Sequence, residues 1–306
     1  MNNVNIQLML EDLRNDNISG ANELIDKALE IVKIQLKSVE EPNESIKEEI
    51  FKLIKQIIDS RPSMAPLINM IGYLIHDLEK VNKLILEERI DQFYVDKVER
   101  EKALTKAFRT FLRNIKVSSP KIMLISYSST IINQLIENKN YDFEIFILES
   151  RPLLEGIRVA ETLSSYFKTN LIIDAAMGKF IDQIDLILIG VDSILKDGSI
   201  INKIGTFPLA VLANEKNIDV YAVGDFFKYN LKDHYGKEVI IEEKPTNELY
   251  SEESQKELLK IHNYYFDITP SKYITGIISD LGILKMEEFL KLAKENLPIE
   301  WYKEFL

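Results

Sequence analysis

The chain has 306 residues, a formal net charge of −11 and a hydrophobic content of 46%. This length fits one large domain or two ordinary ones, and the hydrophobic content is typical of globular proteins. The acidic balance argues against nonspecific nucleic-acid binding, which needs an excess of Lys and Arg on one face. The absence of cysteine excludes disulfides, thiolate metal sites and thiol nucleophiles. Without an apolar run of membrane-spanning length or a signal peptide, the expected location is cytoplasmic, with no membrane partner.

Residues 1–117 are predicted to form an all-helical domain. Apolar residues recur at helical spacing from Ala21 to Leu29, which places them on one face of a helix. Pro62 and Pro66 interrupt the later apolar pattern, because proline is costly inside a helix. Further helices are expected around residues 67–74 and 91–115.

Residues 118–306 are predicted to form a Rossmann-like α/β domain with a doubly wound parallel sheet. Its short apolar runs are continuous rather than alternating, which is typical of strands buried on both faces. These runs cover residues 122–125, 143–148, 171–173, 186–189, 220–223 and 239–241. Helical segments lie between them, such as residues 153–167 with Pro152 at the expected first helical position. This alternation implies right-handed crossovers between parallel strands.

Ligands of such sheets bind at the carboxyl ends of the strands, so the residues after each run are the candidates. The first run is followed by a turn rich in hydroxyl groups, with Ser126, Tyr127, Ser128 and Ser129 in sequence. Such a turn offers hydroxyl and backbone N–H donors to an anion. The alternative is that Ser128 or Ser129 caps the next helix.

The second run is followed by Arg151, immediately before Pro152. A guanidinium at a strand end, next to a helix start, is well placed to bind phosphate through two hydrogen bonds. The alternative is an ion pair of Arg151 with Glu149 or Glu155.

The fourth run is followed by the densest group of polar residues in the chain. Asp192 is a candidate general acid or base, and Asn202 and Lys203 are candidates for binding phosphate and sugar oxygens. The alternative for a lone Asp at a strand end is a helix cap or a turn.

No metal site or cofactor is predicted. The three histidines, His76, His234 and His262, show no metal-ligand spacing. The glycine pattern of dinucleotide-binding proteins and the Walker loop are both missing.

Taken together, these stretches resemble one superfamily. It contains the alpha, beta and delta regulatory subunits of translation initiation factor 2B, ribose-1,5-bisphosphate isomerase and methylthioribose-1-phosphate isomerase. The resemblance is carried by Leu13–Ala21, Arg61–Pro66, Ser126–Ser129, Glu149–Pro152 with Gly156, Gly190–Asp192, Gly198, Asn202–Thr206 and Phe266–Pro270. It covers about residues 13–282. It implies a helical N-terminal domain and a Rossmann-like C-terminal domain through which two chains form a homodimer.

The chain departs from the isomerases at two positions. The isomerases of this superfamily use a cysteine and an aspartate, and here Ser126 stands where the cysteine would be, while Asp192 is kept. A serine hydroxyl does not supply a thiolate or an easily lost proton at neutral pH. The phosphate-binding arginine of the isomerases is replaced by Ser19, just before Gly20. Arg151, Asn202 and Lys203 match the family pattern.

This combination resembles an alpha-type regulatory subunit, which implies a non-catalytic protein that contacts initiation factor 2 through its alpha subunit. We expect it to bind a nucleotide monophosphate or a phosphorylated sugar. The expected ligand-binding residues are Ser19, Gly20, Ser126, Tyr127, Ser128, Arg151, Asp192, Asn202 and Lys203. The first alternative is an aldose–ketose isomerase acting on ribose-1,5-bisphosphate or a related sugar phosphate, with Asp192 and Ser126 as catalytic groups. The second is an α/β scaffold without a ligand.

Overall fold

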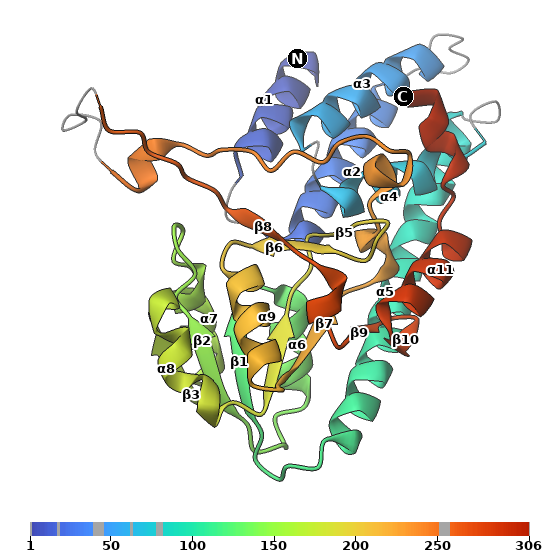
Figure 1. Cartoon of the computed structure of the whole chain (residues 1–306). Helices are drawn as coiled ribbons and strands as arrows, with labels where there is room; N and C mark the ends of the chain where they lie inside the picture. The colour runs from blue at the N-terminus through green and yellow to red at the C-terminus, as the bar shows by residue number, and fades with distance from the viewer. Residues whose placement is uncertain are drawn as a thin grey trace.

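The computed structural model describes residues 2–16, 19–38, 46–61, 64–77, 82–250 and 258–305. Of the stretches that carry the family resemblance, Asn17, Ile18, Pro62 and Ser63 lie outside the described residues. A group of helices stands at one end of an α/β part (Figure 1). None of the helices in the described ranges is long and apolar enough to cross a membrane.

The N-terminal part is helical, as the apolar periodicity predicts. Its helices are α1 (Asn2–Asn15), α2 (Ala21–Lys37), α3 (Ile46–Ser60), α4 (Ala65–Ile75) and α5 (Lys83–Asn114). Helix α5 begins at Lys83 rather than at the predicted residue 91. Asn82 explains this early start, since its side chain accepts a hydrogen bond from Ile85 N at 3.0 Å and caps the helix.

The main sheet has seven strands in the order β10-β9-β7-β4-β1-β2-β3. The strands are β1 (Lys121–Ile125), β2 (Glu144–Leu148), β3 (Lys168–Ile172), β4 (Leu186–Ile189), β7 (Asp219–Val223), β9 (Gly276–Ser279) and β10 (Gly282–Leu284). All neighbours pair in parallel except β9 and β10, which are antiparallel. This is the predicted α/β fold with a mostly parallel sheet.

The prediction of a strand at residues 239–241 is wrong. This segment is irregular and leaves Ile240 66% exposed, and no strand in the described ranges pairs with it. The place beside β7 is taken instead by β9, which pairs with it in parallel. The buried run Ile277–Ile278 of β9 was not among the predicted strands.

A second sheet joins the carboxyl ends of the main strands to the helical part (Figure 1). It consists of β5 (Ser193–Ile194), β6 (Ile200–Lys203) and β8 (Phe266–Thr269), paired antiparallel in the order β5-β6-β8. These short strands carry polar residues such as Asn202 and Asp267, so they gave no apolar run in the sequence. The sheet matters for function because it holds the Asn202–Lys203 pair above the main strands.

Helices between the strands cover the sheet. They are α6 (Ser129–Glu137), α7 (Glu155–Leu163), α8 (Met177–Phe180), α9 (Thr206–Glu215) and, near the C-terminus, α11 (Met286–Asn296). The predicted helix 153–167 is shorter than expected and Pro152 is not its first residue. Leu154 has a left-handed backbone with φ of 59°, which delays the helix until Glu155.

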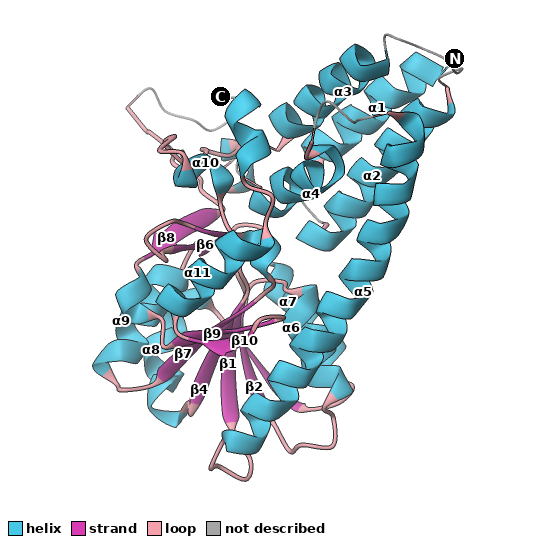
Figure 2. Cartoon of the chain, turned by 90° about the vertical axis from the view of Figure 1, so that its right-hand side faces the viewer, coloured by secondary structure: helices cyan, strands magenta, loops and turns pink. Residues whose placement is uncertain are grey.

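The second half of α5 also packs on the sheet (Figure 2). Phe108 and Leu112 of α5 belong to the same hydrophobic cluster as Ile122 and Leu124 of β1. The expected boundary at residue 117 therefore falls in the loop after a helix that contacts both parts of the molecule.

Asn69 of α4 fixes the helical part to the loop after β7. Its side-chain nitrogen donates to the backbone oxygens of Phe227 at 2.6 Å and Tyr229 at 2.7 Å. All three residues are buried, so these hydrogen bonds satisfy carbonyl groups that water does not reach. Phe93 of α5 adds an edge-to-face contact with Phe227, with ring centroids 5.6 Å apart.

The C-terminal segment returns from α11 to the helical part (Figures 1 and 2). Trp301, the single tryptophan, packs so closely on Gly72 of α4 that a Cβ at Gly72 would lie 1.9 Å from Trp301 Nε1. Glycine at position 72 is thus a steric requirement of this contact.

We expect Gly72→Ala to push Trp301 out of its site, because the new methyl group overlaps the indole ring. The fluorescence emission should shift to longer wavelength as the indole meets water. Gly178→Ala is the matched control, since a Cβ there meets nothing within 4 Å. An unchanged emission maximum in Gly72→Ala would contradict the packing of Trp301 on α4.

Candidate functional site

The turn after β1 is tied to the loop after β2. Ser126 has a left-handed backbone with φ of 70°, and its N–H donates to Ser150 Oγ at 2.8 Å. The Ser126 hydroxyl donates to Glu155 Oε1 at 3.0 Å. The residue that stands at the expected cysteine position therefore contacts a carboxylate at the start of α7.

The loop after β2 is held by its backbone. Both carboxylate oxygens of Asp174 accept hydrogen bonds at 2.8 Å, one from Ser150 N and one from Arg151 N. A Cβ at Gly156 would lie 1.9 Å from the carbonyl oxygen of Leu148, so α7 can approach β2 this closely only with glycine there.

The Arg151 side chain is exposed, and within the described ranges its guanidinium makes neither an ion pair nor a hydrogen bond. The alternative interpretation, an ion pair with Glu149 or Glu155, is therefore wrong. The carboxylate of Glu155 binds Lys203 instead. Arg151 is left with all its guanidinium donors open to a ligand.

Lys203 and Glu155 form a buried ion pair, with 2.7 Å between Nζ and Oε1. Only 5% of the lysine side chain and 18% of the glutamate side chain are exposed. The ammonium also lies 5.1 Å from the centre of the Tyr265 ring. Glu155 is a site residue that the sequence reasoning considered only as a partner for Arg151. The one signal that could have identified it is an acidic residue in the first turn of a helix that follows a strand end.

Asn202 is positioned by a chain of hydrogen bonds. Its side-chain nitrogen donates to Thr206 Oγ1 at 3.0 Å, and that hydroxyl donates to the Lys203 carbonyl oxygen at 2.6 Å. A Cβ at Gly190 would lie 3.1 Å from Ser128 Cβ and 3.6 Å from Asn202 Oδ1. The ends of β1, β4 and β6 therefore meet at one point.

Asp192 is partly buried between β4 and β5, and its N–H donates to the Ile201 carbonyl oxygen at 3.0 Å. Burial raises the pKa of its carboxyl group, the neighbouring ammonium groups of Lys228 and Lys203 lower it, and Glu155 raises it. The net direction is upward, so the protonated form is more favoured here than in a solvated aspartate.

The remaining residues of the turn after β1 have structural partners. Ser128 caps α6, since its hydroxyl accepts a hydrogen bond from Ile131 N at 3.4 Å, in agreement with the capping interpretation. The guanidinium of Arg158 lies over the Tyr127 ring, 4.5 Å from its centre. Both contacts orient the turn without involving a ligand.

Ser19 and Gly20 approach this turn from the helical part. Ser19 N donates to Asp16 Oδ1 at 2.8 Å, and a Cβ at Gly20 would lie 3.8 Å from Ser129 Oγ. The Arg61 side chain donates to backbone oxygens at the end of α1, among them that of Leu13 at 2.8 Å. Arg61 thus holds the end of α1. Gly20, which comes after α1 in the chain, lies beside Ser129 at the start of α6.

Asp267, in the stretch that resembles the family near the C-terminus, has a structural role. Its carboxylate accepts hydrogen bonds from Gly205 N at 2.8 Å and from Phe207 N, at the start of α9. Burial raises its pKa to about 6, although these backbone N–H groups lower it. A carboxylate of the chain itself therefore occupies this helix N-terminus, a position that favours negative charge.

Another partly buried carboxyl group, that of Asp280, lies directly after β9. Burial and the neighbouring Asp225 raise the pKa of Asp280 to about 8, against the opposing effect of Arg100. Its Oδ1 accepts a hydrogen bond from Phe226 N at 3.2 Å. The Arg100 guanidinium lies over Phe227, 4.2 Å from the ring centre, so this cluster joins α5 to the loop after β7.

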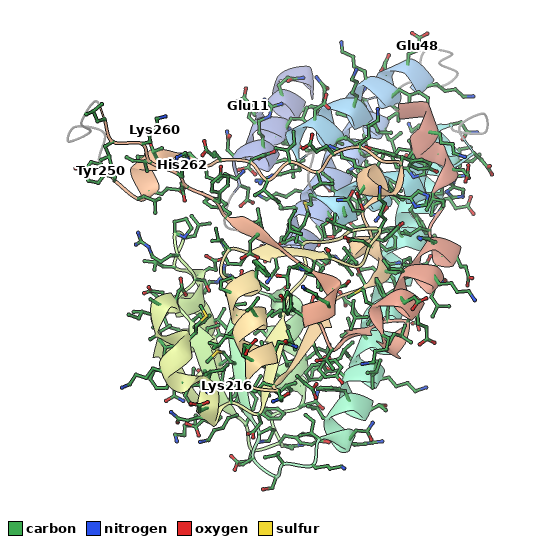
Figure 3. The ribbon with its side chains drawn as sticks, in the orientation of Figure 1. Glu11, Glu48, Lys216, Tyr250, Lys260 and His262 are labelled. Carbon is green, nitrogen blue, oxygen red and sulfur yellow. The ribbon has the colours of Figure 1, made fainter. Side chains whose placement is uncertain are left out.

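Two other surface features lie away from the strand ends. A groove of about 580 Å³ follows α5, where Arg109 pairs with Glu137 at 3.4 Å, as on an ordinary solvated helix face. Tyr250, Lys260 and His262 lie on parts of the chain that project from the body (Figure 3). Neither feature brings together the groups that the sequence singled out.

Comparison with known proteins agrees with the fold. Residues 17–286 match the Initiation factor 2 subunit family. A putative translation initiation factor eIF-2B subunit 2-like protein of Pyrococcus furiosus is 31% identical, over 90% of this chain and 95% of the relative. Ribose 1,5-bisphosphate isomerase of Methanocaldococcus jannaschii is 29% identical, over 90% of this chain and 89% of the relative.

A solved structure is similar as well. The crystal structure of translation initiation factor eIF-2B from Pyrococcus horikoshii OT3 superposes with a TM-score of 0.77 and 26% identity, covering 92% of this chain and 97% of that one. The family match spans most of the sequence, and the helical part followed by a mostly parallel sheet is the fold of that structure. The chain therefore belongs to the Initiation factor 2 subunit family.

Proposed function

We propose that this chain is a non-catalytic regulatory subunit of the initiation factor 2B type, alpha-like and homodimeric. In this proposal it contacts initiation factor 2 through its alpha subunit. It also binds a phosphorylated small molecule, a nucleotide monophosphate or a sugar phosphate, at the carboxyl ends of β1, β2 and β4. The eIF-2B subunit 2-like relative of P. furiosus supports the initiation factor 2B type, whereas the alpha-like assignment rests on the resemblance seen in the sequence.

The observation that carries the proposal is the contrast between Arg151 and Ser126. The Arg151 guanidinium is exposed and free to bind phosphate through charge-assisted hydrogen bonds. Ser126 offers only a hydroxyl group, and that hydroxyl already donates to Glu155. A site with this pair retains a means of holding a phosphate but lacks the thiol of the isomerases, which favours binding without turnover.

The second candidate is an aldose–ketose isomerase for ribose-1,5-bisphosphate or a related sugar phosphate. Its support is the pairing of Asp192, whose raised pKa favours a proton donor, with the Glu155 carboxylate beside Ser126. An acid and a base at one site are the groups that moving a proton between two carbons requires. The isomerase of M. jannaschii is a relative of comparable identity.

Arg151→Ala should weaken binding of ribose-1,5-bisphosphate about tenfold or more, because charge-assisted hydrogen bonds contribute on the order of 1.5–3 kcal/mol. Isothermal titration calorimetry on the intact protein measures this change. Arg113→Ala is the control, since Arg113 is exposed on α5 near the amino ends of the strands. Equal affinities of the native chain and Arg151→Ala would place the phosphate elsewhere.

The partner is tested separately, by immobilising the chain and passing the alpha subunit of initiation factor 2 over it at modest salt. Saturable retention is the expected result. A failure to retain the alpha subunit, with the chain folded and able to bind its phosphorylated ligand, would remove the translation partner from the proposal and leave the ligand site intact.

A further inference from the structure

A row of aromatic rings joins a histidine to the C-terminal segment of the chain. His234 is the last residue of the one-turn helix α10 (Leu231–His234), and its ring lies edge-to-face with that of Tyr235, with centroids 4.7 Å apart. The Tyr235 ring stacks on Tyr302 of the C-terminal segment at 6.1 Å, and Tyr302 contacts Trp301 at 5.3 Å. Both α10 and the C-terminal segment also contact α4. A movement of the histidine ring is therefore passed on through packed aromatic side chains.

The C-terminal segment is attached to the body at two points. The Tyr235 hydroxyl donates to the backbone oxygen of Ile299 at 3.1 Å. The indole of Trp301 packs on Gly72 of α4. Trp301 and Tyr302 are each only 5% exposed, so detaching the segment would bring both rings into water. Because the chain has a single tryptophan, its fluorescence reports this one contact.

His234 is held by a buried tyrosine hydroxyl. Its Nδ1 lies 2.7 Å from the hydroxyl oxygen of Tyr229, a residue that is 0% exposed. Burial raises the pKa of Tyr229, so this hydroxyl keeps its proton. In the part of the chain that the structure describes, the hydroxyl bonds only to His234, so it donates to Nδ1 and the neutral ring carries its hydrogen on Nε2. A proton on Nδ1 would turn the acceptor into a donor and leave the buried tyrosine hydrogen without an acceptor.

Charged groups of several elements face the His234 ring. Lys294 of α11 and Lys196 of the turn after β5 oppose its protonation, whereas Glu300 of the C-terminal segment and Asp233 of α10 favour it. Burial is the largest effect, and the net result lowers the pKa of His234 from its ordinary value of 6.5. The unfolded chain therefore takes up this proton at a higher pH than the folded chain does. The folded arrangement keeps its full stability above pH 6.5 and loses stability as the pH falls toward the lowered pKa.

We propose that His234 is an acid-sensitive latch, in which protonation of Nδ1 breaks the hydrogen bond with Tyr229 and detaches the C-terminal segment from α4. The charged ring moves away from the buried hydroxyl and from the two lysines, and Tyr235, the next residue, moves with it. The helices and the sheet stay folded. The proposal is independent of the proposed function, since neither a ligand nor a protein partner takes part in it.

The test follows the fluorescence of Trp301 in the intact chain from about pH 8 to about pH 5, the range in which histidines titrate. We expect a reversible shift of the emission to longer wavelength, with a midpoint below 6.5 and an unchanged helix signal in circular dichroism. In His234→Asn the amide oxygen accepts from Tyr229 but does not titrate, so its emission should stay constant over the whole range. The controls are His76→Asn and His262→Asn, which change the other two histidines and should keep the native midpoint.

Three results would overturn the proposal. The first is an emission that stays constant in the native chain down to about pH 5. The second is a shift that persists in His234→Asn, because another group, such as Asp267 or Asp280 with their raised pKa values, would then be responsible. The third is a loss of the helix signal at the same midpoint, which would show unfolding of the whole chain instead of release of one segment.

A second variant keeps the test decisive if His234→Asn does not fold. Lys294→Gln removes a positive charge that opposes protonation and leaves the Tyr229 hydrogen bond in place. It should raise the midpoint by roughly 0.2–0.5 pH unit. Lys291→Gln, an exposed change on the same helix, is the matched control and should leave the midpoint where it is. A midpoint that does not rise in Lys294→Gln, or that rises equally in both variants, would reject the latch.

Discussion

The buried ion pair between Lys203 and Glu155 joins the elements on which the site depends. Glu155 begins α7, Lys203 ends β6, and the same carboxylate oxygen accepts the hydroxyl of Ser126 after β1. Breaking one partner of such a pair leaves an uncompensated buried charge, which costs on the order of 3–5 kcal/mol. The ion pair therefore holds the three chain segments in one geometry. It also fixes the positions of the polar side chains that these segments carry.

This geometry divides the strand ends into an occupied and an open half. The occupied half contains Lys203 and Ser126, whose polar groups are satisfied by Glu155. The open half contains Arg151, held only through its backbone by Asp174. Asp192 lies beside the occupied half with a raised pKa. This arrangement leaves the Arg151 guanidinium open to an anion, whereas the Ser126 hydroxyl, at the position of the isomerase cysteine, is already engaged by Glu155.

Most strands of the main sheet were predictable, because continuous apolar runs identify strands buried on both faces. The run at 171–173 is an exception, since it falls at the end of the edge strand β3, with Leu171 47% exposed and Ile173 outside the strand. The apolar run at 239–241 does not form a strand, because no described strand pairs with it. Strands β6 and β8 were not predicted, because they carry polar residues such as Asn202 and Asp267.

The positions of Arg151 and Asp192 followed from the rule that ligands bind at strand ends. The role of Glu155 did not, since its partner Lys203 is distant in sequence and only the second sheet brings the two together.

The central claim is that the site binds a sugar phosphate and leaves it unchanged. The most direct measurement follows ribose-1,5-bisphosphate by NMR during incubation with the purified protein at neutral pH. The account predicts signals that shift or broaden on binding while the aldose remains the only sugar species over time. Accumulation of the ketose product, abolished in Asp192→Asn, would contradict it and identify the chain as an isomerase.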